Sequence, residues 1–275
     1  MVFSFFKNRR RKRWLAQPVP ESWRRVLGES VWQYRHLGEE LQQRVLDFVC
    51  IMLNEKTWAG GGDFEVSEAM KVAVAGQAAV LTFGFEKPFY FDRLQTIIIY
   101  PGAYTSRPDS SEDLLLGGFS DTTFGSDVRA GESWQGGPIV LAWDMVEAEG
   151  RNARRGRNVV LHEFAHHMDG LDGETNGAPP MTDFAFEKRW YKVTGEEYQR
   201  LLSMAQQGVP TLIDRYGAQN HAEFFAVATE CFFTRPYRLA AEHAALFAVL
   251  VRLFGQDPRE WMAADADDCP VLPGK

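Results

Sequence analysis

The sequence predicts one large α+β domain in which helices surround a small mixed β-sheet. Several stretches repeat apolar residues at three- and four-residue steps, the spacing of one buried helix face. Two short runs, 96–100 and 138–143, are apolar and rich in β-branched residues, which favours strands. Because the strand signals come mostly before the later helices, we expect an α+β arrangement rather than a doubly wound sheet.

The elements follow from periodicity and from Gly and Pro signals. Residues 21–56 are predicted to be mainly helical, with breaks at Gly28 and Gly38. The strand at 96–100 ends at Pro101, and glycines make 101–137 a predicted loop. The other predicted helices span 66–83, 158–169, 184–207, 220–233 and 237–254. We therefore expect a single domain over 21–264, flanked by a basic tail at 1–20 and a loose acidic tail at 265–275.

The composition is that of an ordinary globular protein. Of the 275 residues, 45% are hydrophobic and 24% are charged, which favours a sizeable core and argues against disorder. No apolar run approaches the roughly 20 residues that cross a bilayer, and the apolar first six residues are too few for an export signal. Cys50, Cys231 and Cys269 are widely spaced, which argues against a disulfide framework or a cysteine zinc cluster. We expect a cytoplasmic protein with buried thiols and no transmembrane segment.

Positive charge is concentrated in a run of Lys and Arg residues from Lys7 to Arg13. Such an arm can bind nucleic acid or an anionic membrane, and the nearby Phe3, Phe5 and Phe6 suit a membrane surface. A solvated, frayed tail is the simpler interpretation. Since the net charge of the whole chain is −7, the rest of the chain is acidic, and we expect no direct nucleic-acid binding.

The strongest chemical signal is the HExxH motif at 162–166. Positions four apart share one helix face, so His162 and His166 point the same way, as two ligands of one zinc ion must. Glu163 projects about 100° round the helix and can act as a base on a water whose pKa zinc lowers to about 7. His167 also lies about 100° round from His166 and is not expected to be a ligand. The motif predicts one zinc ion and a hydrolytic reaction.

Zinc in a catalytic site needs a third protein ligand, and spacing leaves three candidates. Asp172 lies six residues after His166, but the chain lacks the glycine that an HExxHxxGxxH motif uses to turn. Glu187 lies 21 residues after His166, near the spacing of thermolysin-like enzymes, and Glu223 lies 57 residues after it. Glu223 also fits a capping box that begins at Asn220. Spacing alone does not choose among the three.

Paired blocks of sequence carry a family resemblance. They are the His-Glu-Phe-Ala-His-His-Met-Asp helix at 162–169, the Gly-Gly-Pro-Ile-Val-Leu-Ala-Trp-Asp segment at 136–144, and Tyr216-Gly217 followed by the Ala-Glu-Phe-Phe-Ala block from Ala222, with shorter matches at 34–37 and 78–81. With these blocks the sequence resembles the Mlc titration factor A family of zinc peptidases, over roughly residues 20–255.

The resemblance implies a zincin-like fold and assigns two further residues. Glu223 would be the third zinc ligand, and Tyr216 would supply a hydroxyl that hydrogen-bonds the tetrahedral intermediate. The spacing of these two residues is also similar to that in the catalytic domain of anthrax lethal factor. Without the resemblance, Tyr216 would be read as an aromatic residue in the turn before Gly217.

Two acidic residues are candidates for orienting the ligands, since metal-bound histidines usually donate their second N–H to a carboxylate or carbonyl. Asp169 lies three residues after His166 and could orient it, and Glu230 lies seven residues after Glu223 on the same helix face. For the substrate, the segment 134–143 is the last predicted strand before the motif helix and could pair with an extended peptide.

Three functions are compatible with these residues. The first is a zinc peptidase acting on a peptide or protein, with endopeptidase and aminopeptidase activity both open. The second, implied by the resemblance, is a regulator that sequesters a Mlc-like transcriptional repressor of sugar-uptake genes, with the zinc site structural or auxiliary. The third is a zinc amidase acting on a non-peptide amide by the same chemistry.

Overall fold

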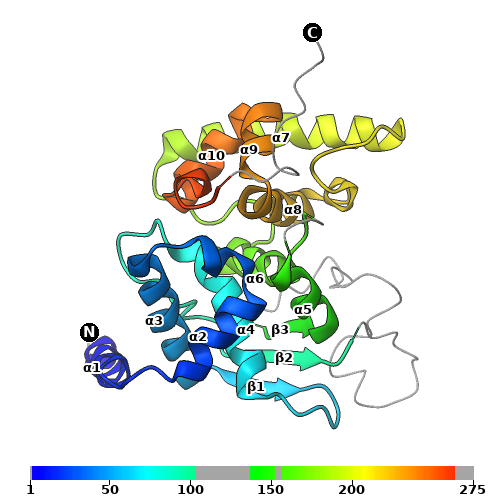
Figure 1. Ribbon diagram of the computed structural model, residues 1–275. Coiled ribbons are helices and arrows are strands. Elements are labelled where there is room, and N and C mark those ends of the chain that lie inside the picture. Colours follow the sequence, from blue (N-terminus) through cyan, green and yellow to red (C-terminus); the bar gives the residue numbers. More distant parts are fainter. Residues whose placement is uncertain (1, 103–136, 153–155, 264–275) are drawn as a thin grey trace.

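The computed structural model describes residues 2–102, 137–152 and 156–263, which form two tiers (Figure 1). The lower tier holds the sheet and the helices up to α6, and the later helices form the upper tier. Helices α6 and α8 pack against each other where the tiers meet.

The helices are α1 (Val2–Leu15), α2 (Glu21–Ser30), α3 (Glu39–Glu55), α4 (Glu68–Ala79), α5 (Trp143–Arg151), α6 (Val159–Asp169), α7 (Phe184–Gln206), α8 (His221–Thr234), α9 (Pro236–Glu242) and α10 (Ala244–Phe254). Short 3₁₀ turns are η1 (Trp32–His36), η2 (Val80–Thr82), η4 (Gly170–Asp172), η5 (Arg215–Ala218) and η6 (Pro258–Glu260).

Most predicted helices are confirmed, with shifted boundaries and two errors. Gly38 does separate two helices, but Gly28 lies inside α2, so the predicted break there is wrong. The single helix predicted over 237–254 is two helices, α9 and α10, which meet at His243. Helix α5 was not predicted, because the apolar start of its sequence was included in the strand signal of 138–143.

The sheet has three strands in the order β1 (Thr57–Gly60), β2 (Thr96–Tyr100) and β3 (Ile139–Ala142). Both strand pairs are parallel, so the expectation of a mixed sheet is wrong for the described residues. The reason is the connection: α4 lies between β1 and β2 and returns the chain to the same end of the sheet, as a βαβ unit requires. Strand β1 was not foreseen, so this pairing could not be predicted.

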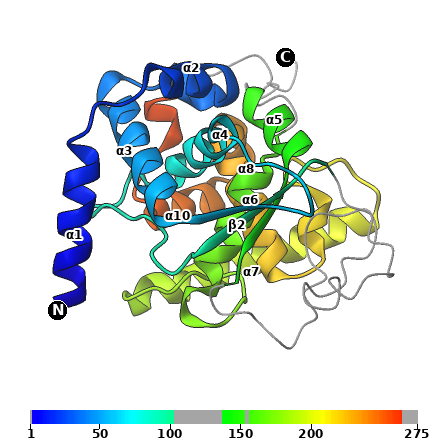
Figure 2. The same ribbon diagram turned by 90° about the horizontal axis from the view of Figure 1, so that it is seen from below.

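The sheet supports the helix that carries the HExxH motif. Strand β3 contacts α6, and Figure 2 shows α4 and α6 lying over the sheet. Helix α4 is buried from Val72 to Ala79 and packs against α2, α3, α5 and α6. Helix α4, which is apolar and surrounded in this way, forms the centre of the lower tier. Its contacts with α6 help to hold α6 in place.

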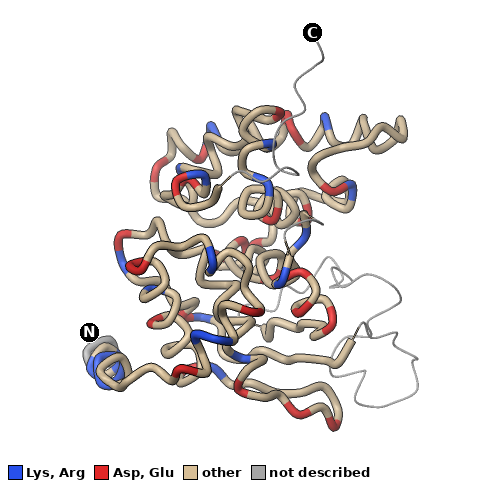
Figure 3. Tube along the Cα trace, in the orientation of Figure 1, with Lys and Arg blue, Asp and Glu red and all other residues tan. Residues whose placement is uncertain are grey.

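The N-terminal segment is a helix rather than the frayed tail that we expected. Lys and Arg residues are dense along α1 (Figure 3), yet Arg11 is buried against the body of the protein. Its Nε donates to Oε1 of Glu55 at 2.8 Å, and its Nη2 pairs with both Glu55 and Asp92. Lys7, one turn earlier, donates to Asp92 at 2.8 Å. These ion pairs hold one face of α1 against α3 and the segment before β2.

Lys56 is a buried cation in the same region. Its Nζ donates to the carbonyl oxygens of Phe91 at 2.6 Å and Leu94 at 2.9 Å, which fixes the chain just before β2. The Phe91 ring in turn packs edge-on against Phe164 of α6, with centroids 4.7 Å apart. Burial lowers the pKa of Lys56 to about 8, although Glu55 and other acidic neighbours act to raise it.

Two predicted segments fall wholly or mostly outside the described residues. They concern the loop over 103–136, which includes Trp134, and the C-terminal tail from 265, which includes Cys269. Of the other two cysteines, Cys231 is buried as expected and Cys50 is half-buried, and neither forms a disulfide with another described residue.

Lys56 makes stability depend on pH in a predictable direction. Its pKa is about 8 in the folded protein and about 10.4 in an unfolded chain, so between these values the unfolded chain binds more protons. The free energy of unfolding of the wild type should therefore rise relative to that of Lys56→Met as pH increases from 8 to 10, by at most about 1.4 kcal/mol per pH unit. Urea denaturation at several pH values measures the difference. Lys188→Met removes an exposed lysine on α7 and should show no such trend; a constant difference for Lys56→Met would contradict the prediction.

Candidate metal centre

Helix α6 begins at a buried network that fixes its position. The side chain of Asn158 caps the helix by accepting from Leu161 N at 2.9 Å, and its Nδ2 donates to Gln77 of α4 at 2.8 Å. Glu149 of α5 accepts from Val159 N at 2.6 Å. Carboxylates and capping oxygens at a helix N-terminus accept hydrogen bonds from its unpaired N–H groups. Their negative charge also interacts favourably with the helix dipole. The histidines of α6 are thus held on a helix that is anchored to both α4 and α5.

Sequence reasoning did not identify this network. Asn158 did carry a signal, since an Asn directly before an apolar run is a typical N-cap. Glu149 and Gln77 carried none, because their role depends on packing between helices that are distant in sequence.

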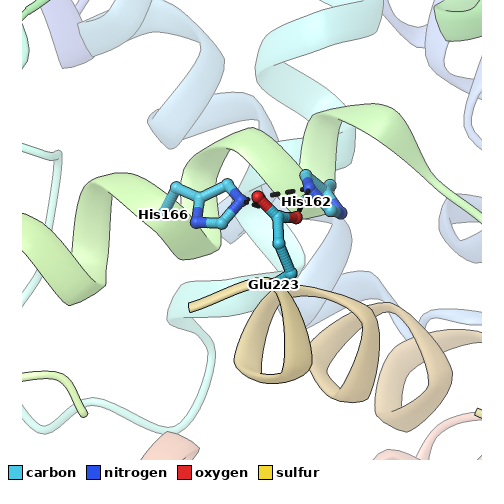
Figure 4. Close-up of side chains that lie close together, drawn as sticks. All are labelled: His162, His166 and Glu223. Atoms are coloured by element: carbon cyan, nitrogen blue, oxygen red, sulfur yellow. Dashed lines mark hydrogen bonds and ion pairs between the residues drawn. The ribbon is translucent and has the colours of Figure 1, made fainter. Parts of the chain in front are cut away.

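Helix α8 places a carboxylate between the two histidines. Figure 4 shows His162 and His166 projecting from α6 toward Glu223 of α8. The Oε2 atom of Glu223 lies 3.2 Å from Nε2 of His162 and 3.4 Å from Nε2 of His166, and the two nitrogens are 3.1 Å apart. Three ligand atoms around one tetrahedral zinc ion lie roughly 3.3 Å from one another when the bonds are about 2.0–2.1 Å. The triangle has the size of one face of such a site.

The start of α8 explains why Glu223 is available. Asn220 caps the helix, and its Oδ1 accepts from Glu223 N at 2.9 Å. In a full capping box the Glu side chain would return to the backbone of the cap residue. Here the Glu223 carboxylate turns to the histidines instead, so only half of the box forms.

The charge and hydrogen bonding of the triangle suit a cation. Glu223 is 2% exposed, and its Oε2 is buried without a hydrogen-bond partner among the described residues. Burial acts to raise the pKa of Glu223, but the two facing histidines lower it to about 2, so the group stays ionised. A buried, ionised oxygen beside two imidazole nitrogens is costly unless a positive charge compensates it. A divalent metal ion supplies that charge and takes this N, N, O donor set.

Glu230, two turns further along α8, holds the first histidine. Its Oε1 lies 2.8 Å from Nδ1 of His162, and its Oε2 accepts from Asn158 N at 2.5 Å. Since an ionised carboxylate only accepts, Nδ1 donates, and in the neutral ring the lone pair is then on Nε2, which faces the triangle. Burial acts to lower the pKa of His162, but its contacts with Glu223 and Glu230 hold that pKa well above the usual value.

Tyr216 lies beside the triangle, in the 3₁₀ turn η5. Its ring centroid is 6.0 Å from that of His162, and its N–H donates to Oδ1 of Asp214 at 2.9 Å. Gly217 lets the turn approach α8 closely, because a Cβ at this position would lie 2.5 Å from Cγ2 of Val227. The turn therefore brings a phenol ring to the side of the histidine pair.

Glu163 follows His162 on α6 and is half-buried. Burial raises the pKa of its carboxyl group, while the nearby His162 and His166 act to lower it. A carboxyl group with a raised pKa beside a metal-binding triangle is typical of a general base.

The other predicted residues lie elsewhere. Asp172 is exposed in η4, Glu187 is half-buried near the start of α7, and neither belongs to the metal-ligating group that the described residues form. The two oxygens of Asp169 accept from the backbone N–H groups of Gly177 at 2.9 Å and Ala178 at 2.8 Å. Its hydrogen bonds therefore anchor the loop after α6, whereas we expected Asp169 to orient His166.

His167 packs against Phe91 rather than joining the triangle. Its ring centroid is 5.9 Å from that of Phe91. Burial lowers the pKa of His167 to about 4, with smaller contributions from the charges of Lys56 and Arg93. It is not one of the three grouped side chains.

Fold and site together define an α+β protein in which two packed helices bring together a His, His, Glu triad that can hold a metal ion. The family of glucose-regulated metallo-peptidases M90 matches this chain over residues 6–255, and the chain belongs to that family. A Synechocystis protein described as uncharacterised is 35% identical over 250 residues, which cover 90% of this chain and 89% of the relative. Proteins named Mlc titration factor A from Yersinia pestis and Yersinia pseudotuberculosis are 30% identical over 244 residues, 85% of this chain and 86% of theirs.

Membership of this family agrees with the predicted class of enzyme. It is a family of metallopeptidases, and the similarity runs from α1 through α10. In the part of the chain that the structure describes, no helix combines the length and apolar character needed to cross a bilayer.

Metal content distinguishes the three candidate ligands. Glu223→Ala removes one corner of the triangle and should sharply lower the zinc bound by purified protein, because two histidines alone leave the ion under-coordinated. Glu187→Ala and Asp172→Ala are matched controls that should retain wild-type zinc. Elemental analysis after dialysis measures the effect. Wild-type zinc content in Glu223→Ala would contradict the prediction.

Proposed function

We propose that this protein is a zinc-dependent peptidase with a zincin-like active site. The observation that carries the proposal is the triangle of His162 Nε2, His166 Nε2 and Glu223 Oε2, whose atoms lie 3.1–3.4 Å from one another next to Glu163. The donor set and its size suit one zinc ion, and the family is one of metallopeptidases. A zinc ion held there supplies Lewis acidity toward a water molecule and a peptide carbonyl.

The protein side chains would then divide the proton transfers and the stabilisation of charge. Glu163 accepts a proton from the attacking water and delivers it to the leaving amine. The hydroxyl of Tyr216 donates a hydrogen bond to the carbonyl oxygen as negative charge develops there. Glu230 keeps the His162 ring in the orientation and tautomer that a ligand needs.

A peptide substrate has a candidate docking strand. Strand β3 lies at one end of the sheet order and, among the described residues, pairs only with β2. It also contacts α6, so an extended peptide added along its free side would run close to the metal centre. Cys50 and Cys231 form no disulfide with another described residue, which is compatible with a reducing compartment, and we place the activity in the cytoplasm.

The proposed roles predict distinct effects of two substitutions. Glu163→Gln keeps the shape of the side chain but removes the base, and should abolish turnover of short peptides while zinc stays bound. Tyr216→Phe should lower kcat by about 10²–10³, the usual loss for one oxyanion donor. Peptide hydrolysis and zinc analysis on the same samples measure both. Glu187→Gln is the matched control and should be active; full activity of Glu163→Gln would overturn the mechanism.

A second function rests on the name of the Yersinia relatives, Mlc titration factor A, which describes an action on Mlc. We propose that this chain also binds a Mlc-like transcriptional repressor, by a surface that the metal centre does not include. On this basis a purified Mlc-like repressor should be retained by immobilised protein, and equally by Glu163→Gln. No retention by correctly folded wild-type protein would count against this function and leave the peptidase proposal untouched.

A further inference from the structure

The 3₁₀ turn η5 carries Tyr216, and an aspartate at its start holds the backbone of that tyrosine. The N–H of Tyr216 donates to Oδ1 of Asp214 at 2.9 Å, and the N–H of Gly217 donates to the carbonyl oxygen of Asp214 at 3.1 Å. Asp214 thereby caps the turn in the way that an N-cap residue caps a helix. These bonds fix the backbone of Tyr216 and so restrict the direction in which its side chain leaves the chain.

The second oxygen of Asp214 connects this turn to the start of α6. Oδ2 of Asp214 accepts from Nε of Arg157 at 2.6 Å and also pairs with Nη2 of the same guanidinium. The residue after Arg157 is Asn158, the cap of α6. The pair spans 57 positions of sequence, so it joins the Tyr216 turn to the metal helix although the two are far apart along the chain.

Further contacts close a ring around the first histidine of the triangle. Asn158 donates its N–H to Glu230, and Glu230 contacts Nδ1 of His162 at 2.8 Å. The rings of His162 and Tyr216 then lie side by side, with centroids 6.0 Å apart. Tyr216 is thus connected to His162 through its ring and to the start of α6 through its backbone cap.

The ion pair is better suited to fixing a position than to stabilising the fold. The Arg157 side chain is 59% exposed and that of Asp214 is 26% exposed, and exposed pairs contribute little to stability. A reaction rate depends more strongly on position, because a misplacement of about 1 Å can cost about 10²-fold. The consequence of losing this pair should therefore appear mainly in the rate.

We propose that Asp214 is a positioning residue for the hydroxyl of Tyr216, and that Arg157 assists it by holding the η5 turn to the start of α6. The inference rests on the peptidase function proposed above, in which that hydroxyl stabilises the developing negative charge. Asp214 is not one of the three grouped metal-ligating side chains, and its effect passes through Tyr216.

Kinetics of a short peptide test this coupling. Asp214→Ala removes both the cap and the ion pair, and should lower kcat by about ten-fold or more with little change in KM, because the hydroxyl acts in the transition state. It should add little to Tyr216→Phe, since both changes remove one interaction. Asp214→Asn keeps an oxygen that can cap the turn and should be more active than Asp214→Ala. An undiminished kcat in Asp214→Ala, or a full further loss in the Tyr216→Phe background, would contradict the proposal.

Asp183 provides a matched control, because it makes the same two kinds of contact elsewhere. Its Oδ1 accepts from Ala185 N at 2.9 Å at the start of α7, and its Oδ2 pairs with Arg252. Helix α7 reaches η5 only later, where the hydroxyl of Tyr198 donates to the carbonyl oxygen of Ala218 at 3.2 Å. Asp183 precedes Tyr198 by roughly 22 Å along the helix axis. Asp183→Ala should therefore keep the kcat and KM of the wild type.

Fluorine NMR tests the position of the ring independently of hydrolysis. Fluorotyrosine replaces the 8 tyrosines, and the resonance missing from Tyr216→Phe is that of Tyr216. In metal-free Asp214→Ala and Arg157→Gln this resonance should move toward that of the exposed Tyr191, and in Asp183→Ala it should stay in place. Movement supports the proposal even if no peptide is cleaved, whereas an unmoved resonance would overturn the role of the substituted residue. Arg157→Gln changes an exposed side chain and remains informative if Asp214→Ala fails to fold.

Discussion

The carboxylate of Glu230 joins the two helices on which the metal centre depends. One oxygen contacts Nδ1 of His162 and the other accepts from the backbone N–H of Asn158, so a single α8 side chain fixes both a ligand ring and the start of α6. Glu223, earlier on α8, meets His162 and His166 further along α6. The contacts of Glu230 and Glu223 can form together only if α6 and α8 run in opposite directions and each helix turns the correct face toward the other. This arrangement determines the size of the triangle formed by the His162, His166 and Glu223 atoms.

This arrangement concentrates negative charge where little water reaches. Glu223, Glu230 and the nearby Glu149 are all buried, and each is paired with a histidine or with backbone N–H groups at the start of α6. Buried carboxylates are tolerated only when such partners or a cation compensate them. A bound cation would compensate the same charges that would destabilise an ordinary core, and the helix dipole of α6 contributes to their stabilisation.

The surrounding fold serves to hold α6 on all sides. Helix α4 and the sheet support it from below, Phe91 packs on Phe164, and Lys56 fixes the backbone of Phe91 through its carbonyl oxygen. The ion pairs of Arg11 connect α1 to the residue before Lys56, so the basic N-terminal helix is linked by contacts to the rear of the metal helix. On the other side, the η5 turn packs against both α7 and α8.

The sequence by itself determined the local features of the site. His162, Glu163 and His166 are four or fewer residues apart on one helix, so helix geometry alone relates them, and the apolar periodicity located α6, α7 and α8 to within a few residues. Tertiary structure decided what depends on contacts between distant segments. Spacing could not choose among Asp172, Glu187 and Glu223, because only the packing of α6 on α8 shows which carboxylate reaches the histidines. For the same reason the parallel sheet, the buried anchor of α1 and the Asn158 network were not foreseen: each depends on contacts between residues ten or more positions apart, and no short-range pattern records such contacts.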